Sequence, residues 1–383
     1  MPAYDAFLLL SFGGPEGPED VLPFLENVTR GRGVPRARLD EVAEHYLAYG
    51  GVSPINGQCR DMLAAIGSQF AAAGMDLPLY WGNRNWHPFI EETVRQMAAD
   101  GVRHALAFVT SAYSSYSACR QYLDDIERVV AAVGPEAPTI DKIRPYFNHP
   151  GFIEPFAAST EAALSSLPAA AQGGARLVFT AHSVPLGMAA ASGSVTAGTA
   201  IPGAVGGRYA AELREAARLI AERTCGGSLP FDLVWQSRSG PPSVPWLEPD
   251  VNDHLTALAK DGAATAAVVV PVGFVSDHME VVHDLDVEAA RTAASLGLPF
   301  ARATAPGATP RFAAMVRELV AERASGEPAL TLGDFPPSEA AADTFAPPPG
   351  DCPADCCRYA PRRPGTSSGG TAADASAAPR VTA

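Results

Sequence analysis

The sequence places one histidine and a row of carboxylates where they could share a site. His182 follows directly after the apolar run Leu177–Ala181. Its imidazole has an ordinary pKa near 6.5, which suits proton transfer or the binding of a metal ion. Further along, Glu280, Asp284 and Glu288 are spaced four residues apart, which puts three carboxylates on one face of a helix. Such a row could relay cations inward or protons outward, because carboxylates and imidazoles suit divalent cations such as Fe²⁺.

Each of these residues also has an ordinary structural explanation. A histidine at the end of a strand can act as a hydrogen-bonding group, and most rows of charge are solvated helix faces. Three like charges on one face destabilise an isolated helix. Two observations favour a site: His278 and His283 lie beside the acidic row, and the row starts where the apolar run Ala266–Val272 ends.

The chain has six cysteines, and three of them, Cys352, Cys356 and Cys357, fall within six residues. So few cysteines in so long a chain are not the disulfide framework of a secreted protein. The spacing is not the usual C-x-x-C pair of a zinc site. Four thiolates can hold a [2Fe–2S] cluster, which would need one more cysteine. The remaining cysteines are Cys59, Cys119 and Cys225. From the residues alone, an iron–sulfur cluster, zinc and unligated thiols all stay open.

Three loops carry weaker signals. Gly13-Gly14-Pro15 lacks the G-x-G-x-x-G spacing and no P-loop lysine follows it, so a tight turn is favoured over a phosphate site. Gln236–Gly240 and Trp246–Asp250 flank a proline-rich turn. Loops that a rigid sheet positions often carry function, but the residues do not decide between that role and a structural one.

The elements that must position these residues are short apolar runs followed by longer amphipathic stretches. The runs are Ala6–Phe12, Leu77–Trp81, His104–Thr110, Arg176–Thr180, Phe231–Gln236 and Ala266–Val272. Each is nearly continuous in apolar residues, which is typical of parallel strands covered on both faces. The stretches between them are long enough for crossover helices, so the sequence predicts a doubly wound α/β fold. Ligands bind at the carboxyl ends of strands in such sheets.

The six runs divide three and three around Pro145–Pro150, which predicts two three-layer α/β domains. We expect an N-terminal domain at 1–148, a C-terminal domain at 149–325, an extension with the clustered cysteines at 326–360 and a disordered tail at 361–383. The tail is rich in Ser, Gly, Ala and Thr without apolar periodicity. Gly187–Gly207 has a similar composition and is expected to be a flexible loop.

Composition excludes several classes of function. Lys and Arg total 28 against 42 Asp and Glu, which gives a net charge of −14. That balance argues against a nucleic-acid surface, which would need a basic stripe, and against attraction to an anionic membrane. No run reaches the roughly eighteen uninterrupted apolar residues of a transmembrane helix, and the N-terminus lacks the basic start of a signal peptide. We therefore expect a cytoplasmic protein.

Six segments resemble those of the ferrochelatase family, specifically its actinobacterial coproporphyrin type. They are Leu10–Pro15, Gly50–Asn56, Thr180–Pro185, Gln236–Gly240, Trp246–Asp250 and Pro271–Glu280, and the resemblance spans roughly Ala6 to Arg323. The family inserts Fe²⁺ into a porphyrin in haem biosynthesis, in a cleft between two Rossmann-like domains. The resemblance therefore implies a lyase that takes coproporphyrin III and Fe²⁺ and releases Fe-coproporphyrin III.

The resemblance also implies roles for individual residues. His182 would bind the metal and take protons from the pyrrole nitrogens, and Glu280 would face it as an iron ligand or proton acceptor. Asp284 and Glu288 would form an acidic relay on a helix that the family winds as a π-helix. The residues expected to contact the porphyrin are Phe12, Ser53, Tyr122, Arg30 and Arg32.

Two of these expectations concern how the porphyrin is held. Arg30 and Arg32 fall in the segment that meets the propionates, where they would act as charge-assisted donors to carboxylates. Phe12 departs from some relatives, which have a tyrosine whose oxygen can ligate the product iron. Phenylalanine cannot do so, so either that face of the iron has no protein ligand or a different group supplies it.

Some ferrochelatases, including actinobacterial ones, hold a [2Fe–2S] cluster with one mid-chain and three C-terminal cysteines. The mid-chain ligand follows the third strand in a Tyr-Ser-x-Cys setting, which Tyr116–Cys119 matches. The resemblance thus implies that the ligands are Cys119, Cys352, Cys356 and Cys357. It leaves Cys59 and Cys225 as ordinary thiols.

Other functions stay open at this point. They are a protoporphyrin IX ferrochelatase, a chelatase for Co²⁺ or Ni²⁺ and a related tetrapyrrole, and a non-catalytic haem or iron–sulfur sensor. The presence of His182 and Glu280 favours an enzyme over a sensor. Coproporphyrin is favoured because the chain lacks the membrane-binding segment that suits a protoporphyrin enzyme of the inner mitochondrial membrane. Transient contacts with neighbouring haem-pathway enzymes are also expected.

Overall fold

Two parallel four-stranded sheets form the frame of the molecule. The computed structural model describes residues 4–31, 33–195, 198, 200, 205–333 and 353–359. The first sheet contains β1 (Ala6–Ser11), β2 (Leu79–Asn83), β3 (His104–Val109) and β4 (Thr139–Lys142) in the order β2-β1-β3-β4. The second contains β5 (Ala175–His182), β6 (Phe231–Gln236), β7 (Ala266–Val270) and β8 (Phe300–Arg302) in the equivalent order β6-β5-β7-β8. The predicted pair of doubly wound α/β sheets is confirmed.

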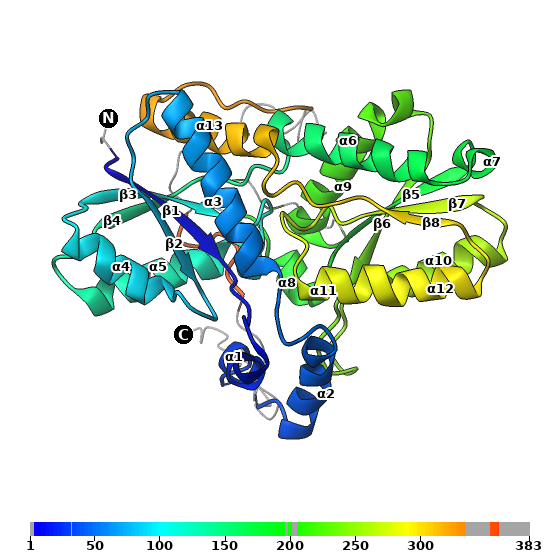
Figure 1. Cartoon of the computed structure of the whole chain (residues 1–383), viewed down its shortest axis with the longest axis horizontal. Coiled ribbons are helices and arrows are strands. Elements are labelled where there is room, and N and C mark those ends of the chain that lie inside the picture. The colour runs from blue at the N-terminus through cyan, green and yellow to red at the C-terminus, as the bar shows by residue number, and fades with distance from the viewer. Residues whose placement is uncertain are drawn as a thin grey trace, which may run out of the picture.

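Helices cover both faces of each sheet, and they follow the strands as crossover connections (Figure 1). The helices of the first half are α1 (Val21–Val28), α2 (Arg36–Leu47), α3 (Ile55–Ala72), α4 (Ile90–Ala99) and α5 (Gln121–Val133). Those of the second half are α6 (Pro150–Ser166), α7 (Ala169–Gln172), α8 (Leu186–Ala190), α9 (Gly207–Arg223), α10 (Val251–Lys260), α11 (Met279–Val281), α12 (Ala290–Ser295) and α13 (Pro310–Ser325). Two segments are π-helical: η2 (Tyr116–Arg120) and η4 (Val282–Ala289). Short 3₁₀ turns are η1 (Pro18–Asp20) and η3 (Cys225–Gly227).

Alternation along the strands sends side chains into three apolar layers. On β1, Phe7 and Leu9 enter a core that continues into the second sheet and includes residues of α3, α6, α9 and α13. Ala6, Leu8 and Leu10 point to the other face, against α4 and α5. The equivalent outer face of the second sheet packs on α10, η4 and α12. Because the inner core is shared by both sheets, it fixes the two halves relative to each other.

The last helix, α13, links the two halves. It packs on α3 of the first half and on α6 of the second, above both sheets in Figure 1. The Arg144 guanidinium, at the end of the first half, forms a two-pronged ion pair with Glu322 of α13, with N–O distances of 2.6 and 2.9 Å. His149 begins the second half as the N-cap of α6. Its Nδ1 accepts a hydrogen bond from the Gly151 amide.

The helices α1 and α2 form a separate unit that projects from the sheets, below and between them in Figure 1. Its small core contains Phe24, Leu39 and Tyr46, and also Met279 from the second half. On the same side, the imidazoles of His45 on α2 and His283 on η4 stack with ring centroids 4.2 Å apart. The α1–α2 unit is therefore held against the segment that carries the acidic row.

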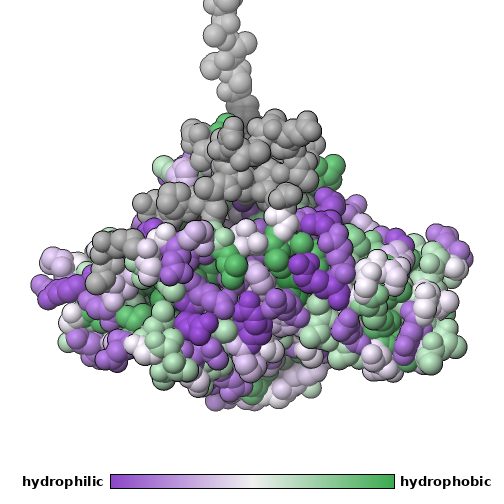
Figure 2. All heavy atoms as spheres, turned by 90° about the horizontal axis from the view of Figure 1, so that it is seen from above, coloured by the Kyte–Doolittle hydropathy of each residue, from purple (hydrophilic) through white to green (hydrophobic). Residues whose placement is uncertain are grey.

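The expected flexible loop at 187–207 is partly regular. Its first residues belong to α8, and Gly207 starts α9. Residues 196, 197, 199 and 201–204 lie outside the described residues, as do most of the predicted extension and the predicted tail at 361–383. No helix in the described part of the chain is long and apolar enough to cross a membrane. On the face shown in Figure 2, hydrophilic and hydrophobic residues are intermixed.

Candidate active site

His182 and Glu280 meet at the carboxyl edge of the second sheet. His182 is the last residue of β5, and Glu280 lies in α11, shortly after β7. β5 and β7 are neighbours, and they are the two strands from which the connections diverge to opposite sides of the sheet. Such a switch point is where doubly wound sheets bind ligands. The two residues that sequence reasoning placed at strand ends therefore share the position that the topology favours for a site.

The geometry gives His182 one defined orientation. Its Nδ1 lies 2.5 Å from the carbonyl oxygen of Ser183, so Nδ1 carries the proton because a carbonyl can only accept. This leaves the Nε2 lone pair available for a proton or a metal ion. Nε2 lies 3.8 Å from Oε2 of Glu280, and the two side chains are 33% and 49% exposed. A base and a carboxylate thus face each other within reach of a ligand.

The acidic row continues from Glu280 along a π-helix, as the resemblance implied. Asp284 and Glu288 both lie in η4. π-Helical turns are rare and occur often at functional sites. Burial, followed by the charges of Glu280 and Glu288, raises the pKa of Asp284 to about 6, although a hydrogen bond from Ser237 opposes this. Glu288 lies 3.5 Å from Nε2 of His283. The row therefore joins the His182 site to the stacked histidines beside α2.

The first half contributes groups around the end of β1. Phe12 follows β1 directly, is 39% exposed, and packs edge to face on Phe24. The Gly13–Gly14 segment is a close turn: Gly13 has a φ of +81°, and a Cβ on Gly14 would lie 2.7 Å from the Cβ of Ser53. Ser53 is buried against this turn, and its amide donates to the Pro15 carbonyl. The turn therefore positions Ser53 next to the residues that follow β1.

Tyr122 is buried at the start of α5, where only 5% of it is exposed. The Arg84 guanidinium lies 3.8 Å from the centre of its ring, and Arg84 Nε donates to Asp125 at 2.6 Å. Nη2 of Arg84 is buried without a hydrogen-bond partner among the described residues. Sequence reasoning did not select Arg84, although it follows β2 at the same edge of the sheet. The position of Arg84 directly after a strand was the one feature of the sequence that could have indicated a role at the site.

Arg30 follows α1 and is exposed, while Arg32 lies outside the described residues. Several large apolar side chains are also exposed at or after the end of α2, or in the segment that follows β5. They are Leu47, Tyr49, Val52 and Leu186.

Comparison with known proteins places this arrangement in a family. The ferrochelatase family model matches residues 4–324. The coproporphyrin III ferrochelatase of Nocardia farcinica is 56% identical over 362 residues, which cover 94% of this chain and 98% of the relative. That of Streptomyces coelicolor is 50% identical over 94% of this chain and 95% of the relative. The ferrochelatase of Rhodopirellula baltica is 48% identical over 96% and 97%.

The chain belongs to the ferrochelatase family. His182, Glu280 and the other expected site residues before the extension all lie inside the family match. The clustered cysteines lie beyond it, but the alignment with the Nocardia ferrochelatase covers 94% of the chain, so it reaches into the extension.

The segment with the clustered cysteines packs beside the region that follows His182. Cys356 and Cys357 are buried, with Sγ atoms 3.7 Å apart. The Gly193 amide donates to Sγ of Cys357 at 3.2 Å, and the Cys357 amide donates back to the Gly193 carbonyl. Tyr359 contacts Tyr116 edge to face, with ring centroids 6.5 Å apart. Cys119 is buried in the same π-helical turn as Tyr116.

The remaining three cysteines are not described as part of the buried segment that contains Cys356 and Cys357. Cys59 is buried and its Sγ lies 3.2 Å from the Ser11 hydroxyl; burial raises the pKa of its thiol to about 11. Cys225 is exposed. Cys352 lies outside the described residues. Among the described residues, no three His, Cys, Asp or Glu side chains lie close enough together to hold a metal ion.

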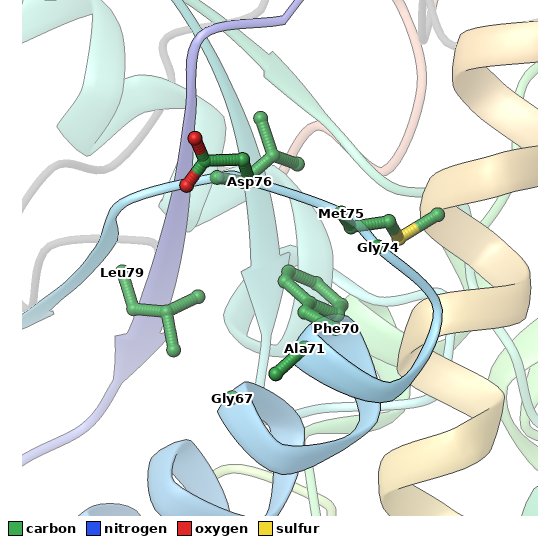
Figure 3. A pocket seen from close by; sticks show the side chains of 8 residues that line it. Gly67, Phe70, Ala71, Gly74, Met75, Asp76 and Leu79 are labelled. Carbon is green, nitrogen blue, oxygen red and sulfur yellow. The ribbon is translucent and has the colours of Figure 1, made fainter.

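A hollow of about 330 Å³ lies elsewhere in this ferrochelatase, between the end of α3 and the start of β2 (Figure 3). Leu77 and Leu79 line it, so it lies at the amino end of the first sheet, opposite the edge that carries the site. Asp76 is the one charged residue among its lining residues. The hollow therefore has no part in the arrangement around His182.

Proposed function

We propose that this protein inserts Fe²⁺ into coproporphyrin III, releasing two protons and Fe-coproporphyrin III. The observation that carries the proposal is the pair formed by His182 Nε2 and Glu280 Oε2, which face each other at 3.8 Å in a chain of the ferrochelatase family. The names of the actinobacterial relatives support coproporphyrin III as the porphyrin.

The reaction exchanges two pyrrole N–H protons for one iron ion. His182 receives a pyrrole proton on Nε2, because its Nδ1 is occupied by the bond to the Ser183 carbonyl. Glu280 binds the incoming Fe²⁺ with its carboxylate, a suitable ligand for a divalent cation. Asp284 and Glu288 extend the negative charge away from this pair, and they serve as the relay between the site and the α1–α2 side of the molecule.

The porphyrin is held by groups from the first half. Phe12 offers an exposed ring to the macrocycle, and Arg30 offers an unshielded guanidinium to a propionate. We assign Ser53 and Tyr122 to contacts with the porphyrin. We add Arg84 as a donor to a propionate, because its buried Nη2 has no partner in the described part of the chain. Arg32 completes the predicted set. Charge-assisted bonds of this kind suit a substrate that carries four carboxylates.

The test is a comparison of kcat/KM for coproporphyrin III and protoporphyrin IX with Fe²⁺ under anaerobic conditions. We expect turnover of both to be catalytic, with coproporphyrin III preferred. A preference for protoporphyrin IX would overturn the substrate assignment. Stoichiometric binding without turnover would overturn the enzyme assignment and indicate a sensor.

We also propose that Cys119, Cys352, Cys356 and Cys357 hold a [2Fe–2S] cluster. Part of the ligand set supports such a group: the buried thiols of Cys356 and Cys357 lie together, and a backbone amide donates to Cys357, an interaction that tunes cluster potentials. Among the described residues, Cys119 does not form a three-residue group with these two thiols. The contact between Tyr116 and Tyr359 brings the segment of Cys356 beside the turn of Cys119. A bound cluster would supply one-electron chemistry and a covalent tie between the extension and the body of the protein.

The cluster is tested by spectroscopy rather than by activity. Cys357→Ser should lose iron, sulfide and the visible absorption of the purified protein, whereas Cys225→Ser, at an exposed cysteine, should keep all three. An unchanged spectrum in Cys357→Ser would contradict the ligand assignment. The cytoplasmic location and the transient contacts with haem-pathway enzymes stay predictions.

A further inference from the structure

Ser237, directly after β6, has an unusual backbone conformation. Its φ is +60°, in the left-handed region that residues other than glycine seldom adopt. Residues held in such conformations gather at functional sites, where the surrounding structure maintains them. The conformation aims the Ser237 hydroxyl at the acidic row, where it donates a short hydrogen bond to Oδ2 of Asp284. The strained backbone of Ser237 therefore positions its hydroxyl for one hydrogen bond, to Asp284, the middle residue of the acidic row.

Gln236, the last residue of β6, reaches the same carboxylate. It is 1% exposed, and its Nε2 donates to Oδ2 of Asp284 at 3.3 Å. The other end of the carboxamide, Oε1, is buried without a hydrogen-bond partner in the described part of the chain. A buried acceptor without a partner is unfavourable and calls for an explanation. A half-turn of the carboxamide would exchange Nε2 and Oε1 and present an acceptor to Asp284.

We propose that Gln236 and Ser237 are positioning residues that hold Asp284 both as a carboxylate and as a carboxylic acid, so that Asp284 takes up and releases the protons displaced from the porphyrin. The carboxylate accepts from the Ser237 hydroxyl and the Gln236 amide. The acid form instead donates its O–H to Oε1 of Gln236 after the half-turn. Each of the two protons passes from a pyrrole nitrogen to Nε2 of His182, then to Asp284 and finally to water, which balances the exchange for Fe²⁺.

The surroundings of Asp284 suit this task. The charged or titratable groups that influence it are Glu280 and Glu288 on its own helical segment and His182 on β5, and Tyr46 on α2 lies within their electrostatic reach. Burial and the two glutamates raise the pKa of Asp284 to about 6, whereas His182 and the Ser237 hydroxyl lower it. Both protonation states are thus accessible near neutral pH, as proton transit requires.

The proposal rests on the proposed ferrochelatase activity, and the pH dependence of kcat tests it. Ser237→Ala removes the donor to the carboxylate, so the pKa of Asp284 rises and the acidic limb of the kcat profile moves to higher pH by about one unit. KM for coproporphyrin III should not change, because Ser237 contacts the relay. Gln236→Met should lower kcat at every pH and leave KM unchanged, because the side chain could no longer donate to the carboxylate of Asp284 or accept from its acid form.

Two glycine variants separate the hydrogen bond from the backbone strain. Ser237→Gly relieves the backbone strain but also removes the hydroxyl. It should shift the pH profile of kcat as Ser237→Ala does, and it should have a higher Tm than Ser237→Ala. Cys225 also has a positive φ, 48°, at an exposed position, and Cys225→Gly should leave the profile unchanged. Infrared spectra should independently show the protonated carboxyl band of Asp284 persisting to higher pH in Ser237→Ala.

The outcomes distinguish this inference from the function on which it rests. Suppose that Ser237→Ala still inserts iron and has the same pH profile and infrared titration as the wild type. This result would overturn the role of Ser237 and Gln236 in holding Asp284, and it would leave the ferrochelatase activity intact. A shift in Ser237→Ala that is absent from Ser237→Gly would also overturn that role, because the backbone and not the hydroxyl would then be responsible. Absence of turnover in the wild-type protein would instead refute the proposed function.

Discussion

Replacing Glu212 by alanine should destabilise this protein severely, because its carboxylate is the buried centre of a contact between the two halves. Glu212 lies on α9 and is fully buried. Its Oε1 accepts from Nε of Arg208 at 2.5 Å and from the Ser114 hydroxyl at 2.8 Å, and its Oε2 accepts from the Ser114 amide at 2.6 Å. Ser114 follows β3 of the first sheet, so one carboxylate joins α9 to the other half of the molecule.

The magnitude follows from what the substitution leaves behind. Glu212→Ala would remove the counter-charge of Arg208, whose side chain is 7% exposed, and the acceptors of a buried amide and hydroxyl. Breaking a buried ion pair by removing one partner costs about 3–5 kcal/mol. At an unfolding entropy of about 2.1 cal/mol/K per residue, about 320 folded residues give a shift of about 1.5 °C per kcal/mol, so the expected loss is roughly 4–8 °C. Denaturant titration with a fluorescence readout gives the free energy of unfolding.

The same helix provides a matched control. Glu222 also accepts from an arginine four residues earlier, Arg218, but its side chain is 54% exposed. Exposed pairs contribute about 0–1 kcal/mol, so Glu222→Ala should be nearly neutral. Equal losses in the two variants would refute the reasoning, since burial would then not decide the cost. A loss below about 1 kcal/mol in Glu212→Ala would do the same.

Two further predictions concern stability against pH. Burial, followed by the charges of Arg144 and Arg311, lowers the pKa of His149 to about 3. The unfolded chain therefore binds a proton at this histidine more readily than the folded protein does. The free energy of unfolding should fall as pH falls from about 6.5 towards 3, by at most about 5 kcal/mol. His149→Asn keeps an acceptor for the Gly151 amide and should flatten this loss in urea titrations; an equally steep loss would contradict it. Asp284 has the opposite sign: its pKa is raised to about 6, so ionisation in the folded state costs stability as pH rises from about 4 through 6. Asp284→Asn should therefore be more stable than the wild type above pH 6, by up to about 3 kcal/mol, and it should insert iron more slowly. Equal free energies of unfolding of the two proteins at pH 7 would contradict the raised pKa of Asp284.

The sequence was most informative where the signal is local. A strand that is covered on both faces needs a continuous apolar run, and the residue after such a run lies at the carboxyl edge of the sheet. That logic placed His182 at the carboxyl end of β5, as observed. The acidic row begins at Glu280, ten residues after β7 ends at Val270, and the resemblance supplied its π-helix. β4 and β8 were not predicted, because Thr139–Lys142 and Phe300–Arg302 are short edge strands without a continuous apolar run.

The partners of the site residues depend on contacts between distant segments, which no local pattern encodes. Ser237 and Asp284 are 47 residues apart, and Arg84 lies 38 residues before the ring that it covers, Tyr122. The return of α13 to the first half likewise follows from packing on α3 and α6 rather than from its own periodicity. The structure therefore adds the residues that support the site, Gln236, Ser237 and Arg84 among them.

The most direct test of the central claim is anaerobic turnover of coproporphyrin III and Fe²⁺ by the wild-type protein and by His182→Ala, followed by visible spectroscopy. His182 is partly exposed and its side chain hydrogen-bonds the carbonyl of the neighbouring residue, Ser183, so the variant should fold. We predict many turnovers to Fe-coproporphyrin III by the wild type, and retained porphyrin binding without insertion by His182→Ala. Insertion by the variant at a rate near that of the wild type would contradict the account.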